Sequence, residues 1–285
     1  ANAGKNAQAA GGALIAIGLN AGVCNTLADG NVFVGAMAGQ FHTGGGNYNF
    51  YGGYATGRVA NYNCSDSPTG GSCNIAFGFN AFGQRAGGHN NVILGRYAGY
   101  ANSTGCNNFA SNNGALMCNV SGSNNFAGGY VTLTANTTGY NNVAIGPSAM
   151  RNNTSGINNI ALGQCALALN TTGGTNIAIG HCAMRCHDTT GNNNLAFGYS
   201  ALRENEGSHN VALGSLASFC NTTGCYNTSL GYNSSKCGTT GCHNVSIGLC
   251  AGALNQTSSD NISIGQHTNY CGIGAANIAI GRKTR

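Results

Sequence analysis

Cysteine is the residue type in this chain whose spacing most plainly allows chemistry. Fourteen cysteines occur among 285 residues, and thiols at fixed intervals form disulfides, bind soft metals or pack as inert side chains. Three pairs are separated by 17 residues, and a fourth pair belongs to one insertion at about residues 58–73. The disulfide candidates are Cys165 with Cys182, Cys220 with Cys237, Cys225 with Cys242, and Cys64 with Cys73.

The interval of 17 residues matters because the whole chain repeats at that spacing. The phrase Asn-Φ-Ala-Φ-Gly, with Φ an aliphatic or aromatic residue, recurs sixteen times, mostly 17 residues apart, several times 16 or 18, and once 25. A short period with one strand motif per repeat is typical of a stacked solenoid. The closing glycine or its equivalent falls at Gly18, Gly35, Gly53, Gly78, Gly95, Asn112, Gly129, Gly146, Gly163, Gly180, Gly198, Gly214, Gly231, Gly248, Gly265 and Gly281.

In such a stack, residues one repeat apart lie about 4.8 Å from each other, which is within the Cα range of a disulfide. We therefore expect disulfides, and with them an oxidising, exported setting. Unpaired packed thiols and a metal are the alternatives. Two sets are formally able to bind zinc although neither has the usual C-x2-C spacing, and we expect neither a metal nor a cofactor. The sets are Cys220, Cys225, Cys237 and Cys242, and His181, Cys182, Cys186 and His187.

Catalytic groups are scarce, and the chain is not expected to be an enzyme. It has six acidic residues. Asp188 and Glu206 occupy equivalent turn positions with Glu204 nearby, so a retaining glycosidase pair is one alternative, although solvated turn residues explain them more simply. The seven histidines are scattered along the chain. No catalytic residue is assigned.

Composition excludes several other classes of protein. Charged residues make up 6% of the chain and glycine contributes 48 residues, unlike an ordinary soluble domain. Glycine has no Gly-X-Y period and hydrophobic residues reach 42% in regular alternation, which excludes collagen and disfavours disorder. No apolar run is long enough to span a membrane, and the formal charge of +5 is too small to indicate nucleic-acid binding.

Each repeat predicts one short strand with two different faces, because side chains alternate along a strand. The flanking aliphatic residues are expected to form the core, and the small middle residues to face another copy of the chain. The alternative is that alanine merely fits a tight coil. The expected core comprises Val143, Ile145, Ile160, Leu162, Ile177, Ile179, Val211, Leu213, Val245, Ile247, Ile262 and Ile264, and the expected interchain face Ala144, Ala161, Ala178, Ala196 and Ala212.

In the rest of each repeat, the sequence predicts a second short strand followed by a turn. An apolar pair such as Ala149-Met150 follows the glycine, and Asn-Thr-Thr-Gly runs such as Asn136 to Gly139 supply turn chemistry. Regular threonine pairs leave open a module that binds ice or a polysaccharide. Asn-x-Ser/Thr triplets are possible glycan acceptors, but the turn motif generates them automatically. We divide the chain into a lead-in at 1–13 and a solenoid domain at 14–285.

These residues resemble a known family. Asn-Val-Ala-Ile-Gly followed by an alanine-rich turn is similar to the head repeat of trimeric autotransporter adhesins, the YadA-like parallel β-roll, and to related viral and phage fibre repeats. The resemblance spans Leu14 to Gly281 and implies a homotrimer. The coil here is about three residues longer than in the adhesin heads, and the cysteines are an additional difference.

The sequence therefore predicts an all-β protein, a parallel β-solenoid of about sixteen 17-residue coils in a homotrimer. Its expected role is that of an extracellular, cell-surface or virion fibre with an adhesive surface for a cell-surface or polysaccharide receptor. A glycan-cleaving spike is a further alternative. Because the final coil, Asn277 to Gly281, is as regular as the others, we also expect the chain to join end to end with copies of itself or with further domains.

Overall fold

The fold was analysed in a computed structural model that describes residues 2–5, 13–25, 29–41, 46–58, 71–84, 87–185, 191–269 and 274–284. The chain divides into two compact units, Ala1–Asn142 and Val143–Arg285. Each unit is a parallel β-solenoid with one short strand per coil, which confirms the all-β solenoid class expected from the repeat. Most of the insertion predicted at about 58–73 lies outside the described residues.

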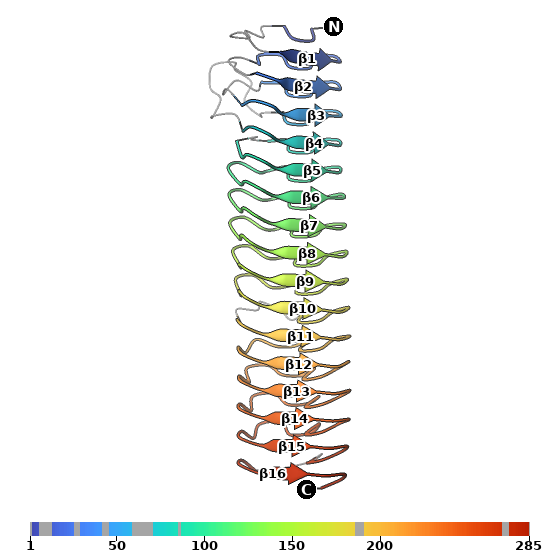
Figure 1. Cartoon of the computed structure of the whole chain (residues 1–285), viewed down its shortest axis with the longest axis vertical. Coiled ribbons are helices and arrows are strands. Elements are labelled where there is room, and N and C mark those ends of the chain that lie inside the picture. The colour runs from blue at the N-terminus through green and yellow to red at the C-terminus, as the bar shows by residue number, and fades with distance from the viewer. Residues whose placement is uncertain are drawn as a thin grey trace. The chain divides into compact units, whose positions relative to one another are not determined.

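The first unit contains seven of the sixteen strands found in the described residues, and each pairs in parallel with the next in sequence order (Figure 1). The register places equivalent repeat residues side by side, as in Ala110 beside Ala127. Residues of the lead-in already bond to the first coil, since Gly4 N donates to Ala21 O and Cys24 N to Lys5 O. The strands are β1 (Leu14–Ile17), β2 (Asn31–Val34), β3 (Phe50–Gly52), β4 (Ile75–Phe77), β5 (Val92–Leu94), β6 (Phe109–Ser111) and β7 (Phe126–Gly128).

The second unit continues the same design with nine strands stacked in sequence order. Its register is equally strict, with Ala161 beside Ala178 and Ala178 beside Ala196. The strands are β8 (Val143–Ile145), β9 (Ile160–Leu162), β10 (Ile177–Ile179), β11 (Leu195–Phe197), β12 (Val211–Leu213), β13 (Thr228–Leu230), β14 (Val245–Ile247), β15 (Ile262–Ile264) and β16 (Ile278–Ile280).

A column of asparagines, buried except for Asn277, connects the coils from β2 onward, with one asparagine at or just before the start of each strand. In Asn108 the side-chain Oδ1 accepts from Asn125 N at 3.0 Å, and Nδ2 donates to Gly122 O at 2.8 Å. Both partners belong to the next coil. Equivalent asparagines recur through both units, and we call this column the asparagine ladder: Asn31, Asn49, Asn74, Asn91, Asn108, Asn125, Asn142, Asn159, Asn176, Asn194, Asn210, Asn227, Asn244, Asn261 and Asn277.

The structure reverses the expected orientation of the strands. The middle residues face the interior, where Ala144 and Ala178 have no exposed surface. The flanking aliphatic residues point outward, and Ile145 remains 44% exposed. The prediction of an aliphatic core and an alanine interchain face is therefore wrong, and the alternative that alanine fits a tight coil is supported. The reversed core residues are Val143, Ile145, Ile160, Leu162, Ile177, Ile179, Val211, Leu213, Val245, Ile247, Ile262 and Ile264, and the buried small residues are Ala144, Ala161, Ala178, Ala196 and Ala212.

The interior of a coil is narrow and is filled by complementary volumes. Where the middle strand residue is alanine, a residue such as Met150 or Leu167 fills the space six positions later, and both of these are buried. The apolar pair containing Met150 lies in a turn and not in the second strand that we predicted.

Where the middle strand residue is large, the position six residues later is glycine. Phe33 and Tyr51 are fully buried, and a Cβ atom at Gly39 or Gly57 would collide with their rings. In these coils a large residue at one of the two positions is thus matched by a small residue at the other.

The glycine that closes each strand is required by the close approach of neighbouring coils. Gly163 has a φ of +133°, and a Cβ atom there would lie 2.6 Å from Gly180 O. A side chain at Gly163 would therefore force these two coils apart. This contact explains why the closing glycine is the most regular mark of the repeat.

The asparagine ladder predicts a sharp contrast between adjacent residues. Asn108→Ala leaves Gly122 O and Asn125 N without their side-chain partners in a buried setting, so it should lower the free energy of unfolding by about 2–6 kcal/mol. The control is Asn107→Gly. Asn107 is exposed with a φ of +57°, and glycine tolerates that conformation, so the change should stay within about 1 kcal/mol. Denaturant unfolding measures both, and equal effects would contradict the proposed role of the ladder.

Candidate functional site

The outward face of the sheet in the second unit is apolar along nearly all of its strands. Its nine strands place two side chains each on this face, and all of them except Thr228 are apolar. Stacking half-buries most of these side chains against their neighbours above and below, while Phe197 and Leu230 remain 54% and 43% exposed. An exposed apolar patch of this kind is a candidate interaction surface. We call this surface the aliphatic face.

The cysteines predicted to form disulfides are free thiols in the structure. The register does bring the predicted pairs to equivalent positions of adjacent coils, but no bond joins them. Cys64 lies outside the described residues. Its predicted partner Cys73 is a free, exposed thiol. Cys24 is disulfide-bonded, and the free candidates are Cys73, Cys165, Cys182, Cys220, Cys225, Cys237 and Cys242.

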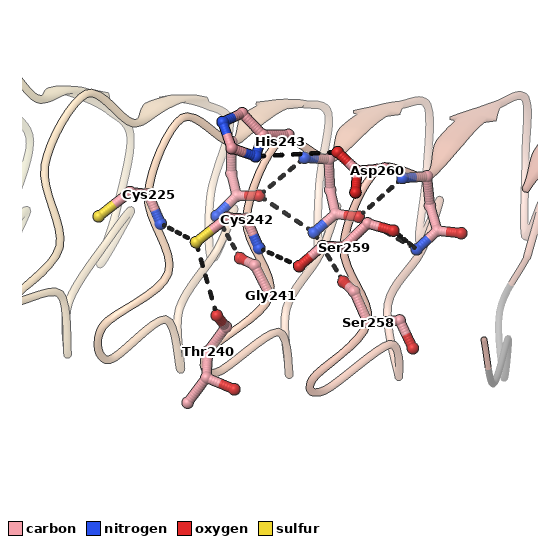
Figure 2. Close-up of polar contacts among 11 residues, drawn as sticks. Cys225, Thr240, Gly241, Cys242, His243, Ser258, Ser259 and Asp260 are labelled. Atoms are coloured by element: carbon pink, nitrogen blue, oxygen red, sulfur yellow. Dashed lines mark hydrogen bonds and ion pairs between the residues drawn. The ribbon is translucent and has the colours of Figure 1, made fainter. Parts of the chain in front are cut away.

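Hydrogen bonding gives a physical reason why Cys225 and Cys242 do not pair with each other. Cys225 N donates to Cys242 Sγ at 3.1 Å, and Cys242 Sγ lies 3.7 Å from Thr240 O, to which it donates (Figure 2). Cys225 Sγ likewise accepts from Ser208 N and donates to Thr223 O. Each sulfur therefore bonds to backbone groups and does not face the neighbouring sulfur.

These two cysteines belong to a longer column of hydrogen-bond acceptors, two residues before the asparagine ladder. Cys242 N donates to Ser259 Oγ at 2.9 Å (Figure 2), and Cys106 N donates to Ser123 Oγ at 3.0 Å. Thiol, hydroxyl, amide and imidazole acceptors serve the same purpose in different coils. We call this set the acceptor column: Asn47, Ser72, His89, Cys106, Ser123, Asn192, Ser208, Cys225, Cys242 and Ser259.

A metal centre of the zinc type does not assemble in the described part of the chain. No group of three or more histidine, cysteine, aspartate or glutamate side chains comes together there. The four thiols Cys220, Cys225, Cys237 and Cys242 are therefore not a tetrahedral set. Of the mixed set, Cys186 and His187 lie outside the described residues.

The acidic and histidine side chains lie on the surface. Glu206 is exposed, and its predicted glycosidase partner Asp188 lies outside the described residues. Next to the acceptor column the rings of His209, Tyr226 and His243 stack at 4.7 and 5.2 Å, and His243 Nδ1 lies 3.8 Å from Asp260 Oδ1 (Figure 2). This is a solvent-exposed stack of rings with one weak ion pair.

Threonine and asparagine in the turn motif have structural roles. Thr222 Oγ1 donates to Thr239 O at 3.1 Å, and Thr239 Oγ1 donates to Gln256 O at 2.8 Å. Thr222 lies in a bend and Thr239 in an irregular segment, so neither is part of a flat strand, which argues against an ice-binding surface. The triplet asparagines Asn136 and Asn170 are fully buried, so the folded chain cannot present them for glycosylation.

Comparison of the chain with protein-family models, with curated proteins and with solved structures found no match. Across the described ranges, no helix has the length and apolar character needed to cross a membrane. Function must therefore be argued from the geometry of the surfaces.

Sequence reasoning missed two features. The exposure of the aliphatic face could not be read from alternation, which does not distinguish inside from outside. The acceptor column has a visible signal, because small polar residues or cysteine recur two positions before the ladder asparagine, but its mixed composition conceals it.

The acceptor column predicts which substitutions a cysteine tolerates. Cys242→Ser should change the free energy of unfolding by less than about 0.5 kcal/mol, since serine occupies the same position in the next coil at Ser259. Cys242→Ala removes the acceptor for Cys225 N and should cost about 1 kcal/mol. Chemical denaturation under reducing conditions compares the two, and a serine variant as unstable as the alanine variant would exclude the acceptor role of the sulfur.

Proposed function

We propose that this protein is a structural fibre component whose solenoids associate laterally through the aliphatic face. The observation that carries the proposal is the apolar, nearly uncharged outward surface of strands β8 to β16. Burial of such a surface is the main favourable term in protein association. A solenoid devoted to catalysis or to a small ligand has no need of this surface.

The occupant that fits the face best is a second copy of the same chain. The side chains repeat with the strand spacing of about 4.8 Å, and only another parallel solenoid presents side chains at the same interval over many coils. Two sheets pack face to face about 10 Å apart when apolar side chains interdigitate. The aliphatic face of one copy therefore suits the same face of another.

The resemblance to adhesin heads makes a homotrimer the expected assembly, and end-to-end joining stays a prediction. We place the fibre outside the cell, on a cell surface or on a virion. Three observations support this location: the resemblance, the low fraction of charged residues, and the disulfide at Cys24, a bond that persists in oxidising compartments.

A double substitution on the aliphatic face tests the assembly. Ile179 and Leu213 point outward from β10 and β12 and are half-buried, so lysine at both positions keeps its charge near solvent in a single chain. We expect the variant to fold but to fall from an oligomer to a single chain, because an interface cannot bury unpaired charges without a large cost. Light scattering measures the mass, and circular dichroism the fold.

Two controls make this test specific. Ala178→Lys places a charge in the interior and should unfold the coils, with a loss of at least about 3 kcal/mol. Thr172→Lys changes an exposed bend residue and should leave the assembly intact. A wild-type protein that stays a single chain at high concentration, or a double variant that still assembles, would refute lateral association through this face.

An adhesive role is a second candidate, supported by an open hollow in the first unit. The hollow has a volume of about 430 Å³ and is lined by Gln84, Tyr97, Tyr100, Ala101, Met117 and Cys118. Tyr97 and Tyr100 meet edge to face at 5.6 Å, and Gln84 Nε2 donates to Tyr100 Oη at 3.2 Å. Aromatic surfaces beside a polar group suit the apolar face of a sugar ring.

Glycan-array binding tests this candidate. Tyr100→Ala removes one wall of the hollow and should lower glycan binding at least tenfold, whereas Tyr199→Ala on the second unit should leave it unchanged. Wild-type protein that binds no glycan, or equal binding by both variants, would refute the adhesive role of the hollow. Neither result would affect the assembly proposal.

A further inference from the structure

Two pairs of free thiols occupy matching positions of adjacent coils, and their sulfurs, unlike those of Cys225 and Cys242, have no described backbone partner. Cys165 and Cys182 occupy the same position of adjacent coils, five residues after Ile160 and Ile177, which face each other in the register of β9 and β10. Cys220 and Cys237 are related in the same way through Val211 and Thr228 of β12 and β13. No described hydrogen bond links any of these four sulfurs to a backbone group.

The backbone holds the thiols of the first pair parallel. Cys165 and Cys182 have φ values of 58° and 56°, and their amides make equivalent bonds to the preceding coil, at 3.0 Å to Pro147 O and at 2.9 Å to Gln164 O. Both side chains therefore leave the backbone in the same direction, one coil apart.

The two thiols of each pair lie close enough for one to shift the pKa of the other. Burial is the main cause that raises the pKa of Cys182, and the neighbouring Cys165 thiol raises it further. Arg185 and Arg203 lower this pKa by a smaller amount. Burial, then the Cys237 thiol, likewise raises the pKa of Cys220; Glu204 raises it further and Lys236 lowers it. His181 Nε2 lies 3.9 Å from Cys182 Sγ, and the His181 ring stacks on Tyr199 at 5.5 Å, so this imidazole is positioned to take a thiol proton.

We propose that each of these two thiol pairs, Cys165 with Cys182 and Cys220 with Cys237, binds one soft monovalent cation of the copper(I) or silver(I) type in two-coordinate geometry. Soft thiolate sulfur selects such ions, and two ligands are enough for them, unlike zinc. With a metal–sulfur bond of about 2.3 Å, a linear site needs its sulfurs about 4.6 Å apart. The coil spacing of about 4.8 Å supplies that separation.

The binding step conserves atoms and charge. One cation and two thiols give a bis-thiolate complex of charge −1 and two protons, with two S–H bonds broken, two metal–sulfur bonds formed and no change of oxidation state. Arg185 and Arg203 near the first pair favour the anionic product. Because protons are released, affinity should rise with pH.

The pair Cys225 and Cys242 provides an internal control. Its sulfurs already accept backbone N–H groups, so binding a cation there would break those bonds. Three double variants, each with serine for both cysteines of one pair, therefore have different expected outcomes. Serine at the first pair is structurally conservative, because Ser148 and Ser200 hold equivalent positions with φ values of 58° and 51°.

The experiment is a silver(I) titration of the reduced protein without oxygen, followed by native mass spectrometry and calorimetry. Compared with wild type, C165S/C182S and C220S/C237S should each lose one tightly bound equivalent, whereas C225S/C242S should lose none. Cys182→Ser alone should abolish the same equivalent as the double variant. Circular dichroism checks that every variant folds.

Three results would overturn the proposal. Silver uptake that falls by the same amount in all three double variants would show binding to thiols in general. A Cys182→Ser variant that keeps its equivalent would exclude a two-thiol site. The third result is wild-type protein that, purified without reductant, contains a disulfide within each pair and binds no silver. That result would show that these cysteines are crosslinks.

Discussion

The asparagine ladder is the interaction on which the rest of this solenoid depends. A coil of about 17 residues has a narrow interior, yet the chain must bend just before the strands, and bends leave buried backbone groups in need of partners. The side chain of asparagine carries both an acceptor and donors. It satisfies an N–H and a carbonyl of the adjacent coil at once.

The narrow interior also decides which residues face the outside. The asparagine ladder and one medium-sized side chain such as Met150 occupy the interior of most coils, so the strand usually turns a small residue inward. Larger aliphatic residues must therefore point outward, where stacking covers about half of their surface. In coils that admit Phe33 or Tyr51, a glycine opposite the ring supplies the missing space. The aliphatic face is thus a consequence of a small core, and it makes association with another apolar surface favourable.

The sequence predicted the period, the parallel stacking, the strand positions and the pairing of equivalent residues, because all of these follow from the regular spacing of Asn-Φ-Ala-Φ-Gly. It did not predict orientation, since alternation shows that Val143 and Ile145 share a face without showing which face is buried. The prediction of disulfides at the described candidate cysteines was wrong for a related reason. Spacing correctly places Cys225 beside Cys242, but their covalent state depends on where the sulfurs point, and backbone N–H groups hold them apart. Apparent glycan acceptors such as Asn136 are buried turn residues, and their burial is revealed only by the structure.

The asparagine ladder has a direction, and this gives the two ends of any stack different properties. Both functional groups of most ladder side chains bond to the coil that follows, as Asn176 does with Asn194 N and Gly191 O. A partly synthesised chain therefore ends in one asparagine whose amide is aligned but unsatisfied. That amide is a template for the next coil. Growth of the folded structure can keep pace with synthesis from the amino terminus, adding one coil at a time, and nucleation is needed only once.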